Sequence, residues 1–214
     1  YIFNNGYFKN TIYSIFYQIE SNSGNNRRSP AMGIQSPTAS ISRYRVEGNL
    51  EKPMIETVRR GLKSNTIEDI DKDSVETSVG WTSFHQPYQP NFEGPSFIFG
   101  TFFVFSLRID KKTVPPKLLH KHLMLASAKR LADTGQRYLS RSEKQVLKEQ
   151  VASRLMQRMP ATPHVHELIW NPEGAALSFF TSLKAANEEL ETLFVRSFGV
   201  SLIRLFPYTT AEFS

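Results

Sequence analysis

Ten lysine and arginine side chains are concentrated between residues 117 and 158 of this chain. Only three acidic residues share that stretch, so its formal charge is +7, whereas the remaining 16 basic and 17 acidic residues give −1. Cations repeated along a helix suit a row of phosphates, because each contact releases counterions and needs no base identity. We therefore predict a sequence-independent nucleic-acid site made by Lys117, Lys121, Lys129, Arg130, Arg137, Arg141, Lys144, Lys148, Arg154 and Arg158.

Six of these residues form pairs spaced four apart, and members of such a pair share a helix face: Lys117 and Lys121, Lys144 and Lys148, Arg154 and Arg158. One alternative is a solvated helical pair whose charges serve only solubility. Another is an interaction module for an acidic protein partner, which would bind polyglutamate as well as DNA at matched salt.

A second kind of chemistry is suggested by Asp110 and Lys112, which form the D-x-K pattern of metal-dependent nucleases. Such a site needs further carboxylates, and Asp69, Asp71 or Asp73 would have to supply them, although no spacing demands it. We expect a charged strand end leading into a turn. Metal-dependent nuclease activity remains the alternative function, but we predict a protein that is not an enzyme, with no catalytic residue.

The histidines offer two H-x-H pairs. His120 and His122 would point to different sides of a helix, whereas His164 and His166 would share a strand face but lack a matching third ligand. The chain has no G-x-S-x-G elbow and no phosphate-binding glycine loop. We therefore predict neither a metal site nor a cofactor.

Aromatic residues would be needed to stack on unpaired bases. The stretch 97–109 is apolar on both faces, as in a central strand covered on both sides, and four phenylalanines are predicted on one face of it: Phe97, Phe99, Phe103 and Phe105. A face with so many apolar side chains indicates that these phenylalanines lie in the core and do not form a platform for base stacking. The basic stretch itself has only Tyr138. Trp81 and Trp170 are also predicted in the core, with Gly80 permitting a turn beside Trp81.

The elements that would position these residues follow from periodicity and from capping signals. Two prolines at 115 and 116 should open a helix that Gly135 ends, and Ser140 with Glu143 forms a capping box that starts a second helix, reaching about residue 159. Strands are predicted at 40–47, 75–84, 97–109, 167–170, 175–180 and 200–206, with residues 171–174 joining two of them, 167–170 and 175–180, in a hairpin. Further helices are predicted at 53–63 and at 185–198, the second of which Gly199 should end.

The predicted fold is α+β, with two β-α-β-β-like units flanking a basic pair of long helices. We expect a first α+β unit at 39–112, the basic helical arm at 113–160 and a second, ferredoxin-like half at 161–214. Residues 1–38 are rich in Asn and Ser, which favours a poorly ordered tail. Alternatively, residues 7–19 form an accessory strand or helix, or translation starts at Met32.

The absence of cysteine removes disulfides and thiolate chemistry. No apolar run approaches the ~20 residues that span a bilayer, and the N-terminus lacks the features of a signal peptide. We therefore expect no membrane association and a cytoplasmic location.

Several motifs in this order resemble the recombination-associated RdgC family. They include Gly80-Trp81 before a proline-containing loop, the strand end 108–115, the stretch 139–151 and Trp170-Asn-Pro-Glu-Gly174. The chain departs from the family in residues 155–160, where Leu-Met-Gln-Arg-Met-Pro stands instead of Leu-Leu-Pro-Arg-Ala-Phe. Family members usually continue further, so we expect a shortened relative or a fragment.

The resemblance implies a nucleoid-associated binder of double-stranded DNA that forms a two-fold ring around the duplex and restrains recombinase-driven strand exchange. It also implies a homodimer, and it marks Arg137, Lys144 and Lys148 as DNA contacts. The departure at 155–160 bears on ring closure, because that region helps to close the ring in the family.

Overall fold

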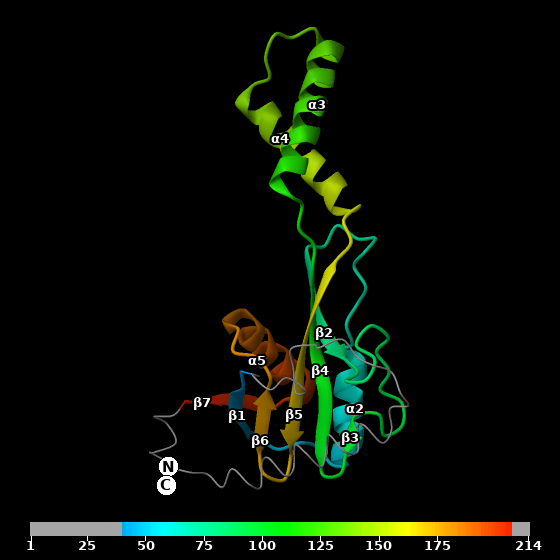
Figure 1. Ribbon diagram of the computed structural model, residues 1–214, viewed down its shortest axis with the longest axis vertical. Helices are drawn as coiled ribbons and strands as arrows, with labels where there is room; N and C mark the ends of the chain where they lie inside the picture. The colour runs from blue at the N-terminus through cyan, green and yellow to red at the C-terminus, as the bar shows by residue number, and fades with distance from the viewer. Residues whose placement is uncertain (1–39, 207–214) are drawn as a thin grey trace. The chain divides into compact units, whose positions relative to one another are not determined.

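The computed structural model describes residues 40–206 (Figure 1). The tail predicted at 1–38 therefore lies outside the described residues. The elements in chain order are β1 (Ser42–Glu47), α2 (Met54–Ser64), β2 (Thr77–Thr82), β3 (Ile98–Phe99), β4 (Phe102–Lys111), α3 (Pro116–Thr134), α4 (Arg141–Met156), β5 (Thr162–Asn171), β6 (Ala176–Phe179), α5 (Lys184–Phe198) and β7 (Ser201–Leu205). This order confirms the predicted α+β class and adds one strand, β3.

The strands form one seven-stranded sheet in the order β2-β4-β5-β6-β1-β7, with β3 paired to β4. Within residues 40–206 the first strand, β1, runs antiparallel to β6 and to β7, and Tyr44 lies opposite both Leu177 and Arg204. Strands from the two ends of the described range therefore build the same part of the sheet.

The chain divides into two compact units, each assembled from separate segments. Among the described residues, the first unit comprises 40–66, 81–107 and 165–206, and the second comprises 67–80 and 108–164. The basic helices α3 and α4 belong to the second unit. The boundaries predicted after residues 38, 112 and 160 stay predictions.

The apolar stretch 97–109 is not one strand, as predicted, but a hairpin of β3 and β4. Gly100 takes a positive φ of 60° and turns the chain together with Thr101. Because of that turn, Phe99 and Val104 pack together in one buried cluster. In a single continuous strand these two residues would lie on opposite faces. The prediction that these aromatic residues are core is confirmed, since all four phenylalanines are buried.

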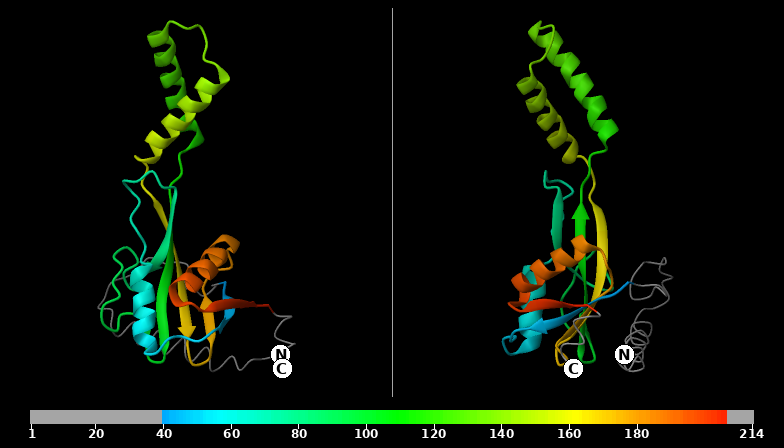
Figure 2. Two further views of the ribbon diagram at one scale, coloured as in Figure 1. Left: turned by 180° about the vertical axis from the view of Figure 1, so that it is seen from behind. Right: turned by 90° about the vertical axis from the view of Figure 1, so that its left-hand side faces the viewer.

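In the first unit α2 and α5 lie on the same side of the sheet (Figure 2). Aromatic rings of the strands and of α5 pack together in the core of this unit. Trp81 and Trp170 are 0% and 1% exposed, which confirms both core predictions. Phe198 of α5 contacts both indoles, with ring centroids 5.8 Å and 5.2 Å away, and Phe194 lies 4.8 Å from Trp170. Burial of such large rings is the main stabilising term for this unit.

Two turn predictions have different outcomes. Gly80 lies inside β2, which continues to Thr82, so the prediction that it permits a turn is wrong. The hairpin between β5 and β6 is confirmed: the Asn171 side chain accepts a 2.9 Å hydrogen bond from the Gly174 backbone N–H. The positive φ of that turn, 46°, falls on Ala175.

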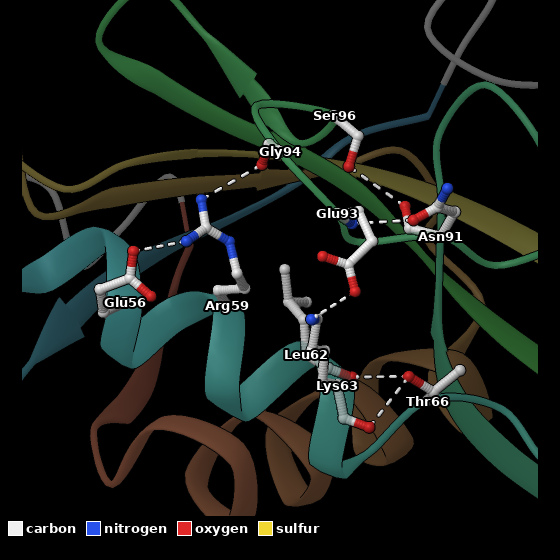
Figure 3. Close-up of polar contacts among 9 residues, drawn as sticks. All are labelled: Glu56, Arg59, Leu62, Lys63, Thr66, Asn91, Glu93, Gly94 and Ser96. Atoms are coloured by element: carbon white, nitrogen blue, oxygen red, sulfur yellow. Dashed lines mark hydrogen bonds and ion pairs between the residues drawn. The ribbon is translucent and has the colours of Figure 1, made fainter.

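The loop before β3 is fastened to α2 by two basic side chains of the helix (Figure 3). Arg59 donates a 3.2 Å hydrogen bond to the Gly94 carbonyl, and its guanidinium lies over the Phe97 ring. Lys63 forms a 2.6 Å ion pair with Glu93. The hydrogen bond from Lys63, and then the charge of its ammonium group, lower the pKa of Glu93 below its ordinary value.

Candidate functional site

The predicted basic arm is a hairpin of α3 and α4, which lie side by side within the second unit (Figure 1). Pro116 stands in the first turn of α3, and Gly135 ends the helix with a φ of 67° and an N–H that donates to the Leu131 carbonyl. At the start of α4 both halves of the Ser140–Glu143 capping box are present. The capping hydrogen bonds lower the pKa of Glu143, so its side chain stays ionised to a lower pH than an ordinary glutamate does. The predicted start and end of α3 and the start of α4 are confirmed.

An apolar seam holds the two helices together. On α4 the more buried side chains recur every four residues, and on α3 a partly buried strip repeats at three and four residues, the spacing expected of one helix face. The seam residues are Leu118, Leu119, Leu123, Ala126 and Leu131 of α3, and Leu147, Val151 and Leu155 of α4, joined by Leu139 of the turn. No residue of α3 is fully buried, so this helix packs on little besides α4 and most of its surface is exposed to solvent.

All ten predicted site residues lie on this hairpin or in the turns beside it, and all ten are exposed. Within residues 40–206, none of the ten makes an ion pair with an acidic side chain. The charge of Arg130 acts on the nearby Glu143 carboxylate. Because none of the ten is held in an ion pair, these cations are available to an external polyanion.

The lysines of α4 lie beside the seam. Lys144 and Lys148 continue the row that is buried further along the helix as Val151 and Leu155, at intervals of four, three and four residues. On the outer face of α4, Gln145 instead donates a 2.7 Å hydrogen bond to Glu149. Lys144 and Lys148 thus place two positive charges one turn apart along a flank of the seam, as successive phosphate contacts would require.

A buried lysine connects the segments at the base of this hairpin. Lys112 is 4% exposed, and its Nζ atom donates 2.8 Å hydrogen bonds to the carbonyls of Asp71 and Asp73 and a 3.4 Å hydrogen bond to that of Met156, the last residue of α4. The Asp71 carboxylate accepts a 2.8 Å hydrogen bond from the Ala161 N–H. These bonds fasten the 71–73 turn to the end of β4 and to the exit of α4, a role that the sequence analysis missed.

The carboxylate of the D-x-K pattern is already occupied. Asp110 is 1% exposed and accepts two hydrogen bonds from Arg108, at 2.7 Å from Nε and 2.6 Å from Nη2. Of the three acids considered as its partners, Asp71 and Asp73 lie in the 71–73 turn that Lys112 fastens, and Asp69 precedes that turn. Two of them accept backbone N–H bonds through their carboxylates, Asp69 from Asp71 and Asp71 from Ala161.

Neither histidine pair gathers further ligands. His166 packs edge-on against Phe179 with ring centroids 5.8 Å apart, while His164 is exposed. Across residues 40–206, no three His, Asp or Glu side chains are grouped closely enough to hold a metal ion. Over the same range, no helix combines the length and the apolar character needed to cross a membrane.

A shallow hollow of about 210 Å³ lies between the helices near their connecting turn. Its lining includes Arg130 of α3, Leu139 of the turn and Leu147 of α4. The turn also carries Tyr138, whose side chain is 78% exposed. Neither the hollow nor the exposure of Tyr138 can be recognised from a sequence motif, because both depend on the conformation of the turn.

Comparison with protein-family models gives a match over residues 39–212 to the family described as "Putative exonuclease, RdgC". No curated protein matches the chain. The match covers most of the sequence, including both basic helices and every strand of the sheet. The chain therefore belongs to the RdgC family.

Proposed function

We propose that the protein binds double-stranded DNA without sequence preference, through the phosphate backbone, using the ten cations of the α3–α4 hairpin. The observation that carries this proposal is the exposure of all ten cations without ion-pair partners in the described chain. Membership of the RdgC family supports a recombination-associated, DNA-related role. Cations on a thin helical hairpin form an interface by charge density and need no pocket.

Under this proposal binding is the whole mechanism. Two copies arranged about a two-fold axis would double the +7 of residues 117–158 along a shared channel. A closed clamp or ring would then have to open before the DNA leaves, and the enclosed duplex would be a poor substrate for strand exchange. We propose this homodimeric arrangement, and antagonism of a recombinase in the nucleoid, as the biological consequence.

The test is fluorescence anisotropy with a labelled duplex of about 30 base pairs, comparing wild type with Lys144→Ala/Lys148→Ala. A matched control is Arg60→Ala/Lys184→Ala, which removes two exposed cations of the first unit and so makes the same charge change. We expect the hairpin variant to bind at least tenfold more weakly at moderate salt and the control to bind like wild type. Equal loss in both variants would show a non-specific charge effect and would contradict the proposal.

The family description favours a second candidate, exonuclease activity. Asp110 is the only aspartate in the sequence that forms a D-x-K pattern. Its carboxylate would have to release Arg108 before it could hold a metal. The duplex should therefore stay intact with magnesium over the time of the binding assay. Magnesium-dependent cleavage that Asp110→Ala abolishes would contradict a function limited to binding. Competition by polyglutamate as effective as competition by DNA would instead favour an acidic protein partner.

A further inference from the structure

The turn between α3 and α4 presents an aromatic ring among arginines. Tyr138 is 78% exposed, more than any other large apolar side chain in the described chain. Arg137 precedes it directly, Arg141 follows three residues later, and both are exposed. A single exposed tyrosine is ordinary by itself, but an exposed aromatic ring flanked by cations is the composition that binds single-stranded nucleic acid.

The turn is held in shape on both sides of Tyr138. Gly135 ends α3 in the left-handed conformation, Leu139 is 4% exposed, and Ser140 begins α4 through its capping box. Because the next residue is anchored in the seam, the Tyr138 ring cannot fold back easily onto the hairpin. Little conformational entropy would then be lost when the ring meets a ligand.

The two basic residues that flank Tyr138 in the turn are both arginines, Arg137 and Arg141. Their planar guanidinium groups bind phosphates and also stack, whereas the ammonium group of a lysine acts as a point charge toward phosphates. The turn is therefore suited to contacts with bases as well as with the backbone.

We propose that Tyr138 stacks on an unpaired nucleobase while Arg137 and Arg141 bind the flanking phosphates, so that the protein prefers duplex DNA containing a short single-stranded gap over fully paired duplex. The inference rests on the proposed function and adds a ligand class to the same surface. The ring supplies a contact that is independent of base identity, because every base has a π-face.

The test uses two probes of about 30 base pairs that carry the fluorescent base 2-aminopurine at the same position, either paired or within a short gap. Wild-type protein should quench the unpaired probe and bind it more tightly than the paired one. Tyr138→Ala should lose roughly 5- to 150-fold in affinity for the gapped probe, the range measured for single stacked bases, and should change affinity for the paired probe less than twofold.

Tyr138→Phe keeps the ring and should retain both the quenching and the preference. Tyr88→Ala is the matched control, since Tyr88 is an exposed tyrosine of the first unit. The inference is overturned if Tyr138→Ala behaves like wild type on the gapped probe, if it weakens both probes equally, or if it changes the oligomeric state. Failure of the wild-type protein to bind even the paired probe at low salt would instead overturn the proposed function.

Discussion

The Nζ atom of Lys112 donates a 2.8 Å hydrogen bond to the main-chain carbonyl of Asp71, forty-one residues earlier in the chain. The ammonium group is buried, and the carbonyls of Asp73 and Met156 accept from it as well. A buried charge is tolerated when hydrogen bonds satisfy it, and the satisfied network then specifies one arrangement. Lys112 thus determines how the 71–73 turn and the exit of α4 are joined to β4.

Replacing Lys112 by methionine should lower the free energy of unfolding by about 2 kcal/mol, because three main-chain carbonyls would lose the donor that joins their segments. Chemical denaturation followed by circular dichroism measures this loss. Lys111→Met is the control, since Lys111 is the exposed residue directly before Lys112, at the end of β4, and should change stability by less than about 0.5 kcal/mol. Equal stabilities of the two variants would refute the role assigned to Lys112.

Gly61 of α2 should tolerate no side chain. A Cβ atom there would lie 2.4 Å from the Ser197 carbonyl oxygen and 2.8 Å from the Phe198 ring. Alanine normally stabilises a helix interior relative to glycine by about 1 kcal/mol, but this overlap should outweigh that gain. We expect Gly61→Ala to destabilise the protein by about 1–3 kcal/mol, with Ser64→Ala on exposed α2 surface as a neutral reference. A rise in melting temperature would show that α2 and α5 are not so close.

Ala175 offers a change of opposite sign. Its φ of 46° lies in the left-handed region, which costs a residue with a Cβ atom about 1 kcal/mol relative to glycine. Ala175→Gly should therefore raise the free energy of unfolding by up to that amount. Ala176→Gly, one residue later in strand β6, should lower it by about 0.5–1 kcal/mol. If both substitutions destabilise equally, the turn assigned to residues 171–175 is wrong.

The ion pair between Lys63 and Glu93 predicts a dependence on acid. The pKa of Glu93 is below its ordinary value of 4.5, so the pair contributes fully above pH 4.5 and is lost as the pH falls through the lowered pKa. The protection factors of amides in the loop preceding β3, which are corrected for the intrinsic pH dependence of exchange, should fall over that acidic range. Lys63→Met should give fast exchange already at neutral pH and abolish this pH dependence. An identical pH profile in the variant would mean that the ion pair does not hold the loop.

Local signals predicted the helical hairpin well. Pro116, Gly135, Ser140 and Glu143 mark starts and ends through backbone chemistry that depends on near neighbours in sequence. The same holds for Gly199, which ends α5 with a φ of 68°. Residues whose role is set within four positions are accessible to sequence reasoning.

The misses have a different origin. The stretch 97–109 is so uniformly apolar that Gly100 was the only sign of its turn, and glycine also occurs inside strands, as Gly80 does. The pairing of β1 with β6 and β7, and the carbonyls that receive Lys112, depend on contacts between distant segments. Periodicity carries no information about such partners. A lysine at an exposed strand end and a buried lysine that bonds distant carbonyls, as Lys112 does, therefore look alike in sequence.

The most direct test of the central claim is the salt dependence of duplex binding. The logarithm of the binding constant falls linearly with the logarithm of salt concentration, with a slope of about −0.9 per neutralised phosphate. Removing Lys144 and Lys148 together should make the slope shallower by about 2, whereas Arg60→Ala/Lys184→Ala should leave it unchanged. A hairpin variant with the wild-type slope, or a wild-type protein whose affinity does not respond to salt, would contradict binding through these cations.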